Sequence, residues 1–250
     1  MVFSAFLASV MQVDVPVVVF IEVGLAIWVV YTWDHLSDAK TAKEVSSFRH
    51  QFHHQHQQAL LIGLIGALIT GAALVYFLPI QTIYLGISIA VLVLIYFAII
   101  HFYKKFYHKE TLVAIVYTLG VFLGPYSCAE RIATSSLIAC FANVVLLAFV
   151  NLMIFSEFEK EADQKAGYPS LALALGHNAR PLIAGVLVFQ LLTLIMLFSL
   201  EVISDQVAFC FILMNLMLCL IFFGQSLSQR NEYYRVIGDG IFFIPVIFLL

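Results

Sequence analysis

The sequence predicts an all-α fold, a polytopic transmembrane helical bundle, and its composition is the first reason. The chain of 250 residues is 63% hydrophobic and only 11% charged, whereas soluble domains average about 45–50% apolar and about 25% charged residues. This composition excludes a disordered chain, a collagen and an ordinary soluble enzyme. Two further observations, the spacing of the apolar stretches and the distribution of the basic residues, predict the same fold.

Eight apolar stretches approach the length of about 20 residues that a helix needs to cross a bilayer. They lie at about 15–33, 59–78, 80–101, 111–127, 134–156, 181–200, 206–226 and 236–250. The apolar fragment at 1–11 is too short to span and predicts an abbreviated N-terminal helix. We therefore expect eight full helices and one abbreviated helix, forming a single transmembrane domain over residues 1–250.

The basic residues gather in alternate loops. Eleven of the twelve Lys and Arg residues fall in the loops at 34–58, 102–110, 157–180 and 227–235, whereas the opposite loops hold only Arg131. Cytoplasmic loops of membrane proteins carry such an excess of Lys and Arg. We therefore expect a multi-pass protein of a bacterial inner membrane, with these loops and any site they carry facing the cytoplasm. The net charge of −3 gives no reason to expect a nucleic acid partner.

An acidic pair follows the first full apolar stretch. Asp34 and Asp38 are spaced i, i+4, so on a helix they lie on one face, close enough to share a divalent cation. Taken alone, the pair favours a solvated helix end that carries two surface acids.

A second acidic segment follows the stretch at 134–156. It holds two i, i+4 pairs, Glu157/Glu161 and Glu159/Asp163, which lie about 200° apart around a helix and so cannot both face one site. Taken alone, this segment is equally consistent with a charged amphipathic linker.

The two segments together indicate more than either does alone, because both follow a spanning helix at the same membrane face. Magnesium usually binds through a few carboxylates together with substrate phosphates, so two facing acidic pairs favour a diphosphate ligand. Lys and Arg side chains nearby would neutralise its remaining charge.

The second segment resembles a motif of the UbiA-type intramembrane prenyltransferases. The family's Asp-x-x-x-Asp, commonly followed by Gly after three further residues, is matched by Glu159-x-x-x-Asp163-x-x-x-Gly167, with Glu for the first Asp. The stretch at 170–180 is similar to the family's continuation into its seventh helix. Lys104-Lys105 is similar to its basic pair, and with the short first helix the resemblance covers nearly the whole chain.

The first segment resembles the family's first motif, Asn-Asp-x-x-Asp-x-x-x-Asp, in part. Asp34-x-x-x-Asp38 matches its last two acids, but Val30 and Tyr31 stand where the family has Asn and Asp. One carboxylate of the first cluster is therefore absent from the motif.

The resemblance implies a prenyltransferase that moves an isoprenyl group from an isoprenyl diphosphate to a lipophilic or aromatic acceptor within the lipid bilayer. It implies that Mg²⁺ is the cofactor and that the metal ligands, which are also the catalytic residues, are Asp34, Asp38, Glu159 and Asp163. It further implies that the diphosphate-binding residues are drawn from Arg49, Lys105, Lys160 and Lys165.

Two other functions stay open. The absent carboxylate at Tyr31 is what favours a catalytically silent UbiA-like protein that binds an isoprenoid lipid or a partner. The run from His50 to His56 contains the His-x-x-His-His pattern found in membrane di-iron desaturases, but the other histidine boxes of that class are missing from the sequence. Glu22 is a further candidate, since ionisable residues inside a membrane are often functional.

Overall fold

The computed structural model describes residues 1–41, 55–103, 106–130, 133–229 and 232–249, and in this part every regular element is helical. This confirms the predicted all-α class. The α-helices are α1 (Val2–Val10), α2 (Val17–Thr41), α4 (Gln57–Leu74), α5 (Ile80–Phe102), α6 (Lys109–Cys128), α7 (Thr134–Phe158), α8 (Lys160–Ala166), α9 (Leu171–Leu175), α10 (Ala179–Ser199), α11 (Asp205–Phe223), α12 (Gln225–Ser228) and α13 (Tyr233–Gly240). Three short 3₁₀ helices complete the set: η1 (Val75–Phe77), η2 (Gly176–Asn178) and η4 (Ile241–Phe248).

Among the described residues, seven helices are long and apolar enough to cross a membrane, and they coincide with the first seven predicted stretches. The eighth stretch takes another form, because α13 ends at Gly240 and the chain continues as the 3₁₀ helix η4. Pro245 lies inside η4, and proline has no N–H to donate to a helical hydrogen bond. The predicted abbreviated helix is α1, which has nine residues.

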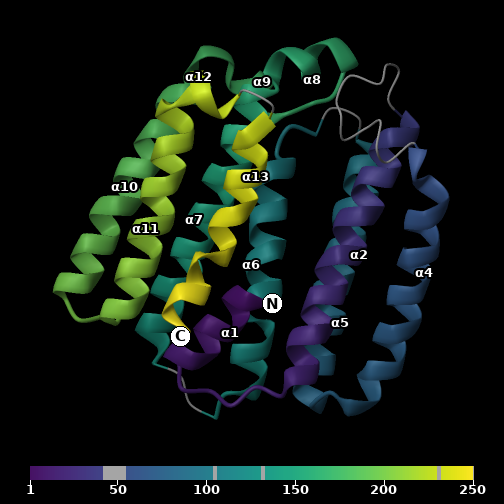
Figure 1. The fold of residues 1–250 in the computed structure, drawn as a ribbon, viewed down its shortest axis with the longest axis vertical. Helices are drawn as coiled ribbons and strands as arrows, with labels where there is room; N and C mark the ends of the chain where they lie inside the picture. The colour runs from purple at the N-terminus through teal and green to yellow at the C-terminus, as the bar shows by residue number, and fades with distance from the viewer. Residues whose placement is uncertain (42–54, 104–105, 131–132, 230–231, 250) are drawn as a thin grey trace.

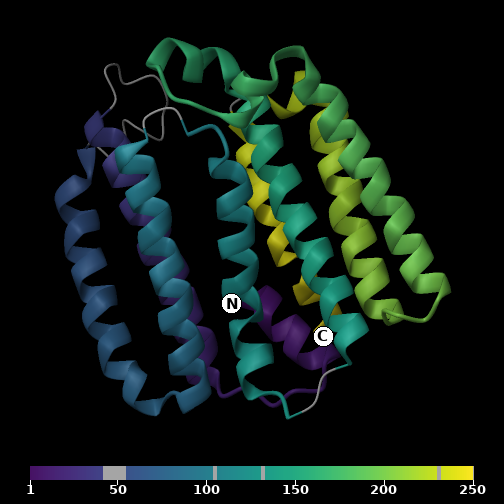
Figure 2. The ribbon, with the colours of Figure 1, turned by 180° about the vertical axis from the view of Figure 1, so that it is seen from behind.

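The spanning helices alternate in direction, so the charged segments gather at one end of the bundle. Figure 1 shows the end of α2, the start of α4, and α8, α9 and α12 together at the top, whereas the α4–α5 and α10–α11 connections lie at the bottom. Figure 2 shows the same arrangement from behind. The described parts of the loops that the charge pattern placed on one membrane face therefore lie at one end of the fold.

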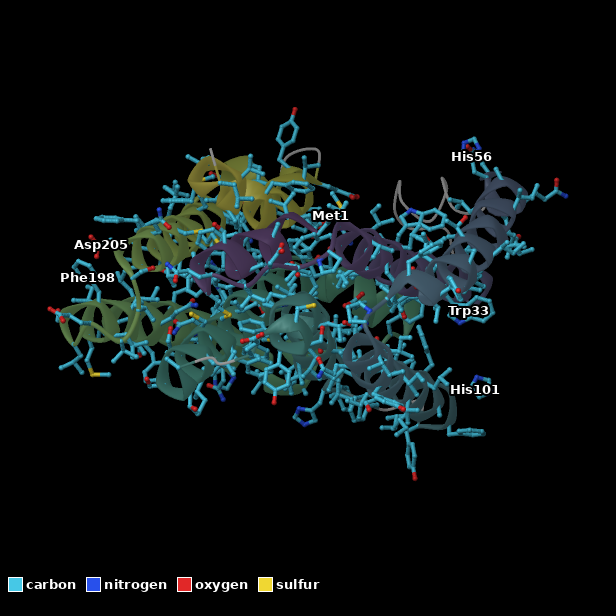
Figure 3. The ribbon with its side chains drawn as sticks, turned by 90° about the horizontal axis from the view of Figure 1, so that it is seen from below. Met1, Trp33, His56, His101, Phe198 and Asp205 are labelled. Carbon is cyan, nitrogen blue, oxygen red and sulfur yellow. The ribbon has the colours of Figure 1, made fainter. Side chains whose placement is uncertain are left out.

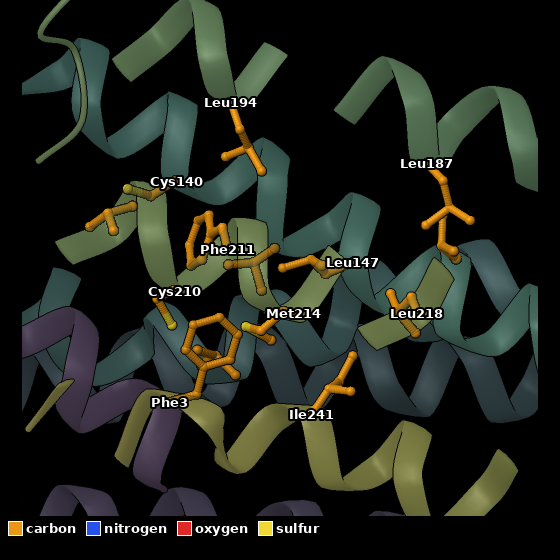
Figure 4. Packing of buried hydrophobic residues seen from close by; sticks show 14 of the residues in the cluster. Phe3, Cys140, Leu147, Leu187, Leu194, Cys210, Phe211, Met214, Leu218 and Ile241 are labelled. Atoms are coloured by element: carbon orange, nitrogen blue, oxygen red, sulfur yellow. The ribbon is translucent and has the colours of Figure 1, made fainter. Parts of the chain in front are cut away.

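The main hydrophobic core lies in the half of the bundle built by α1, α6, α7, α10, α11 and η4 (Figure 4). Half of the spanning part of α7 is buried inside the bundle, against 6% for α5. The short helix α1 contributes fully to this core, since the ring of Phe3 packs edge-on against Phe211 at 5.9 Å between centroids. The bundle is thus well packed on one side.

The other side, built by α2, α4 and α5, exposes much more apolar surface. Seen along the helices in Figure 3, Trp33 and His101 project outward at this edge, and Phe198 does so at the opposite edge. Trp33 is 48% exposed. An apolar exterior of this kind suits a hydrocarbon solvent, in which buried and lipid-facing positions are similarly apolar.

Two side-chain amides, those of Gln190 and Asn215, connect the well-packed helices within the apolar core. Gln190 of α10 donates to the backbone oxygen of Asn143 in α7 at 3.0 Å, and Asn215 of α11 donates to Gln190 Oε1 at 3.0 Å. Asn215 also donates to the backbone oxygen of Leu187 at 3.2 Å. Gln190 and Asn215 are fully buried, so these bonds join α7, α10 and α11 where water cannot compete.

We expect Asn215→Leu to lower the free energy of unfolding by about 1 kcal/mol, because it removes two interhelical hydrogen bonds and leaves Gln190 Oε1 unpaired. Thr193→Val on the exposed side of α10 is the control, since its hydroxyl bonds only within its own helix, to the backbone oxygen of Phe189. Denaturant unfolding in detergent micelles measures both variants. Equal stability of the two would contradict an interhelical role for the amides.

Candidate functional site

The acids of the first segment lie at the upper end of α2 (Figure 1). Asp34 is partly buried there, and Asp38 lies one turn further along the same helix. The side chain of Asp38 is outside the part of the chain that the structure describes. The helical backbone at both positions agrees with the predicted i, i+4 spacing on one face.

Glu159 lies at the junction where α7 ends and α8 begins. Its Oε1 accepts a hydrogen bond from the Tyr234 hydroxyl at 2.8 Å and forms an ion pair with Nη2 of Arg235. Both partners belong to α13, and the Nε of Arg235 lies 3.6 Å from Glu232 Oε2. One oxygen of the first acid in the second motif is thus engaged by two donors from the last helix.

Asp163 lies one turn further along, and its amide donates to the backbone oxygen of Glu159 at 2.8 Å. It lines an open pocket of about 610 Å³ together with Tyr107, Tyr168 and Leu173, among other residues. Burial raises the pKa of the Asp163 carboxyl to about 6. A carboxyl that is partly desolvated at the edge of a pocket is a candidate functional group.

The start of α6 supplies two charged residues that the sequence interpretation missed, Lys109 and Glu110. Lys109 acts on Asp163 by lowering its pKa, and Glu110 acts in the opposite direction, so both lie near it. Glu110 is only 4% exposed, and its two oxygens accept from the Leu171 amide at 3.2 and 3.3 Å. The only feature of the sequence that could have identified Lys109 and Glu110 is their position directly before an apolar stretch. That stretch does not show that α6 begins beside α8 and α9.

The four predicted diphosphate-binding residues fall in different places. Lys160 donates to the backbone oxygen of Gly176 and lies 3.4 Å from Glu157 Oε2, so it joins α8 to the segment after α9. Lys165 is exposed on α8. Arg49 and Lys105 lie outside the described residues, as do His50, His53 and His54 of the histidine run.

In the part of the chain that the structure describes, no three His, Cys, Asp or Glu side chains lie close enough together to hold a metal ion. Of the two acids in the second motif, Asp163 lines a pocket, whereas Glu159 is bound to Tyr234 and Arg235 of α13. Glu22 lies elsewhere, in the first half of α2, where a Cβ on Gly71 of α4 would approach its Oε1 to 2.9 Å.

The sequence matches the UbiA prenyltransferase family over residues 1–235, and the chain belongs to this family. It is accordingly an integral, multi-pass membrane protein. The matched range includes both acidic segments. No curated protein sequence matches the chain closely enough to suggest a more specific relative.

Three solved structures share the fold. A UbiA homologue from Archaeoglobus fulgidus bound to GPP and Mg²⁺ gives a TM-score of 0.69 at 11% identity, covering 98% of this chain and 93% of its own. The apo structure of a UbiA homologue from Aeropyrum pernix K1 gives 0.67 at 15% identity, covering 100% and 98%. A structure from work on digeranylgeranylglyceryl phosphate synthase in membranes gives 0.61 at 13% identity, covering 98% and 91%.

The raised pKa of Asp163 predicts a pH dependence of stability. The folded chain holds this proton more tightly than the ordinary carboxyl value of 3.8 allows. The resulting stabilisation is therefore complete below about pH 4 and is lost as the pH rises through about 6. We expect the melting temperature of the wild type, taken relative to Asp163→Asn, to fall over this range in metal-free buffer.

Differential scanning fluorimetry in detergent measures this difference. Taking the wild type relative to the variant removes the contributions of the other acids, such as Glu159, which the two proteins share. If the melting temperature of the wild type instead rises relative to that of Asp163→Asn as the pH increases, nearby cations determine the pKa of Asp163 more strongly than burial does.

Proposed function

We propose that the chain is a magnesium-dependent prenyltransferase, which moves an isoprenyl group from an isoprenyl diphosphate to a lipophilic or aromatic acceptor. The observation that carries the proposal is the Asp163 carboxyl, which lines a pocket at the end of the bundle where Asp34 and Asp38 also lie. Membership of the UbiA family and a neighbour bound to GPP and Mg²⁺ support the same substrate class.

Asp163 fits a magnesium ion better than Glu159 does. Magnesium is usually held by one or two carboxylates together with waters and substrate phosphates, so a cage of three protein ligands is not required. Asp163 offers its carboxyl to an open pocket, whereas one oxygen of Glu159 already binds Tyr234 and Arg235. In this proposal Asp34 and Asp38 supply the remaining carboxylates from α2.

Magnesium bound to the diphosphate would neutralise the charge that builds on it as the allylic C–O bond breaks. The chain's own groups act on the same charge, because Lys109 adds positive charge beside Asp163 and attracts the anionic substrate. Lys165, exposed on α8, adds a second positive charge to the same segment. Arg49 and Lys105 are proposed to bind diphosphate oxygens from neighbouring loops. Apolar and aromatic helix walls below would shield the prenyl group from water.

The proposed site opens to the cytoplasmic side of a bacterial inner membrane. Support comes from the bias of eleven basic residues to the loops at this end, which in most membrane proteins marks the cytoplasmic side. An isoprenyl diphosphate approaching from that side would meet the charged loops first, while its apolar tail could remain in the bilayer.

A second candidate function is isoprenoid binding without catalysis. It is favoured by Val30 and Tyr31, which replace the Asn-Asp of the family's first motif, and by the engagement of Glu159 with α13. The replacement at Tyr31 and the engagement of Glu159 each reduce the number of carboxylate oxygens that are free to bind magnesium. A transfer assay separates this function from the enzyme.

We expect purified protein with isolated membrane lipids and a labelled isoprenyl diphosphate to transfer label to the lipid extract when Mg²⁺ is present and not when EDTA is added. Asp163→Asn should reduce transfer by about 100-fold or more, because it removes a carboxylate that would hold magnesium at the diphosphate.

Glu161→Gln is the matched control, since it makes the same change of charge on an exposed residue of the same helix. It should keep the wild-type rate. Absence of transfer by every protein, with retained binding of the labelled diphosphate, would instead establish the non-catalytic function.

A further inference from the structure

The residues that join Glu159 to α13 are largely buried, and neighbouring aromatic rings hold them in place. Arg235 and Glu159 side chains are 17% and 21% exposed, and the Tyr234 residue is 5% exposed. The Tyr234 ring lies between Phe155 and Phe158, edge-on to both at 5.6 and 5.3 Å between centroids. Such edge-to-face pairs favour one ring position, so the hydroxyl is aimed at Glu159 by the last turn of α7 itself.

The Arg235 guanidinium is held in the same way. It lies 5.9 Å from the centroid of Phe155 and 5.7 Å from that of Tyr234, within cation–π range. An arginine that stacks on aromatic rings while pairing with a carboxylate loses little further freedom when the ion pair forms. The carboxylate therefore meets two donors that are already oriented.

Close packing of α13 on α7 fixes the distance between these groups. A Cβ on Gly238 would lie 2.5 Å from Asn151 Oδ1 and 2.6 Å from Phe155 Cε1, so only glycine permits this approach. Arg235 and Tyr234 lie about one turn earlier on α13 and thus reach the end of α7, where Glu159 begins α8.

We propose that Glu159 is a positioning residue, held by Tyr234 and Arg235, that sets the direction of α8 and so places Asp163 at the pocket, and that it is not a magnesium ligand. The inference rests on the proposed function for what Asp163 does. Glu159 is the residue before α8, and its backbone oxygen accepts the Asp163 amide, so fixing the Glu159 side chain fixes the turn that carries Asp163.

The residue type at 159 supports this role. The family motif has Asp here, and the Glu side chain extends one methylene further, toward α13. A metal ion bound through Oε1 of Glu159 would have to displace Arg235. The largely buried guanidinium would then keep only its 3.6 Å contact to Glu232, which is costly. The two acids of the second motif therefore have different roles. Glu159 fixes α8 to α13, and Asp163 faces the ligand.

The test combines a double-mutant cycle with a ligand-induced shift in melting temperature, using Mg²⁺ and inorganic diphosphate as the probe. In the ligand-free cycle we expect Glu159→Gln and Arg235→Gln each to lower the melting temperature, and the double variant to melt no lower than the worse single variant. Glu232→Gln is the matched control, because Glu232 faces the other side of Arg235 and is 40% exposed; it should change little.

With the probe, we expect Glu159→Gln to keep its stabilisation by Mg²⁺ and diphosphate, with the half-saturating Mg²⁺ concentration raised by less than about threefold, whereas Asp163→Asn should lose it. Glu159→Asp separates the roles most sharply. This variant keeps the carboxylate, but its shorter side chain does not reach α13. If Glu159 is a positioning residue, Glu159→Asp should therefore lower the melting temperature as Glu159→Gln does.

The proposal is overturned if Glu159→Gln loses the probe response as fully as Asp163→Asn while Glu159→Asp keeps it, since that pattern defines a direct ligand. It is also overturned if the effects of Glu159→Gln and Arg235→Gln on melting simply add. If the wild type shows no response to the probe, the proposed function fails, and the ligand-free cycle still decides whether Glu159 anchors α8 to α13.

Discussion

In hydrocarbon, every backbone N–H and C=O must find its partner inside the protein, and this constraint organises the whole chain. It makes the spanning segments helical and apolar, and it leaves charged chemistry to the helix ends. Two buried side-chain amides in the core, those of Gln190 and Asn215, are likewise hydrogen-bonded between helices. The acids of the two candidate motifs are accordingly at one end of the bundle, at the end of α2 and around α8.

The site inherits its geometry from the better-packed half of that bundle. α7 carries the second acidic motif directly beyond its last turn, and α13 packs against α7 closely enough to reach Glu159 with Tyr234 and Arg235. α6 begins beside the same segment, where Glu110 bonds the Leu171 amide. α7 and α13, whose contacting residues lie 75 positions apart, therefore fix Glu159 directly before α8, and α6 fixes the beginning of α9. In contrast, Asp34 and Asp38 come from α2, in the half with fewer buried side chains.

The all-helical fold was predictable because hydropathy and loop charge both follow from the bilayer and need no knowledge of contacts. The resemblance to the family motif made Asp163 a candidate for the same reason, since i, i+4 spacing is local. The partners of Glu159 lie 75 residues away on α13, and Lys160 bonds a carbonyl 16 residues on; no local pattern shows such pairings. The break between α13 and η4 was missed because an apolar stretch reads the same whether its backbone is α-helical or 3₁₀.

In our proposal the acidic end of the bundle binds a magnesium-complexed isoprenyl diphosphate through Asp163. Titration calorimetry with GPP measures this directly and needs no acceptor. We expect saturable binding of one GPP per chain that requires Mg²⁺, disappears with EDTA and is lost in Asp163→Asn but not in Glu161→Gln. Binding that is unchanged by EDTA or by Asp163→Asn would contradict it.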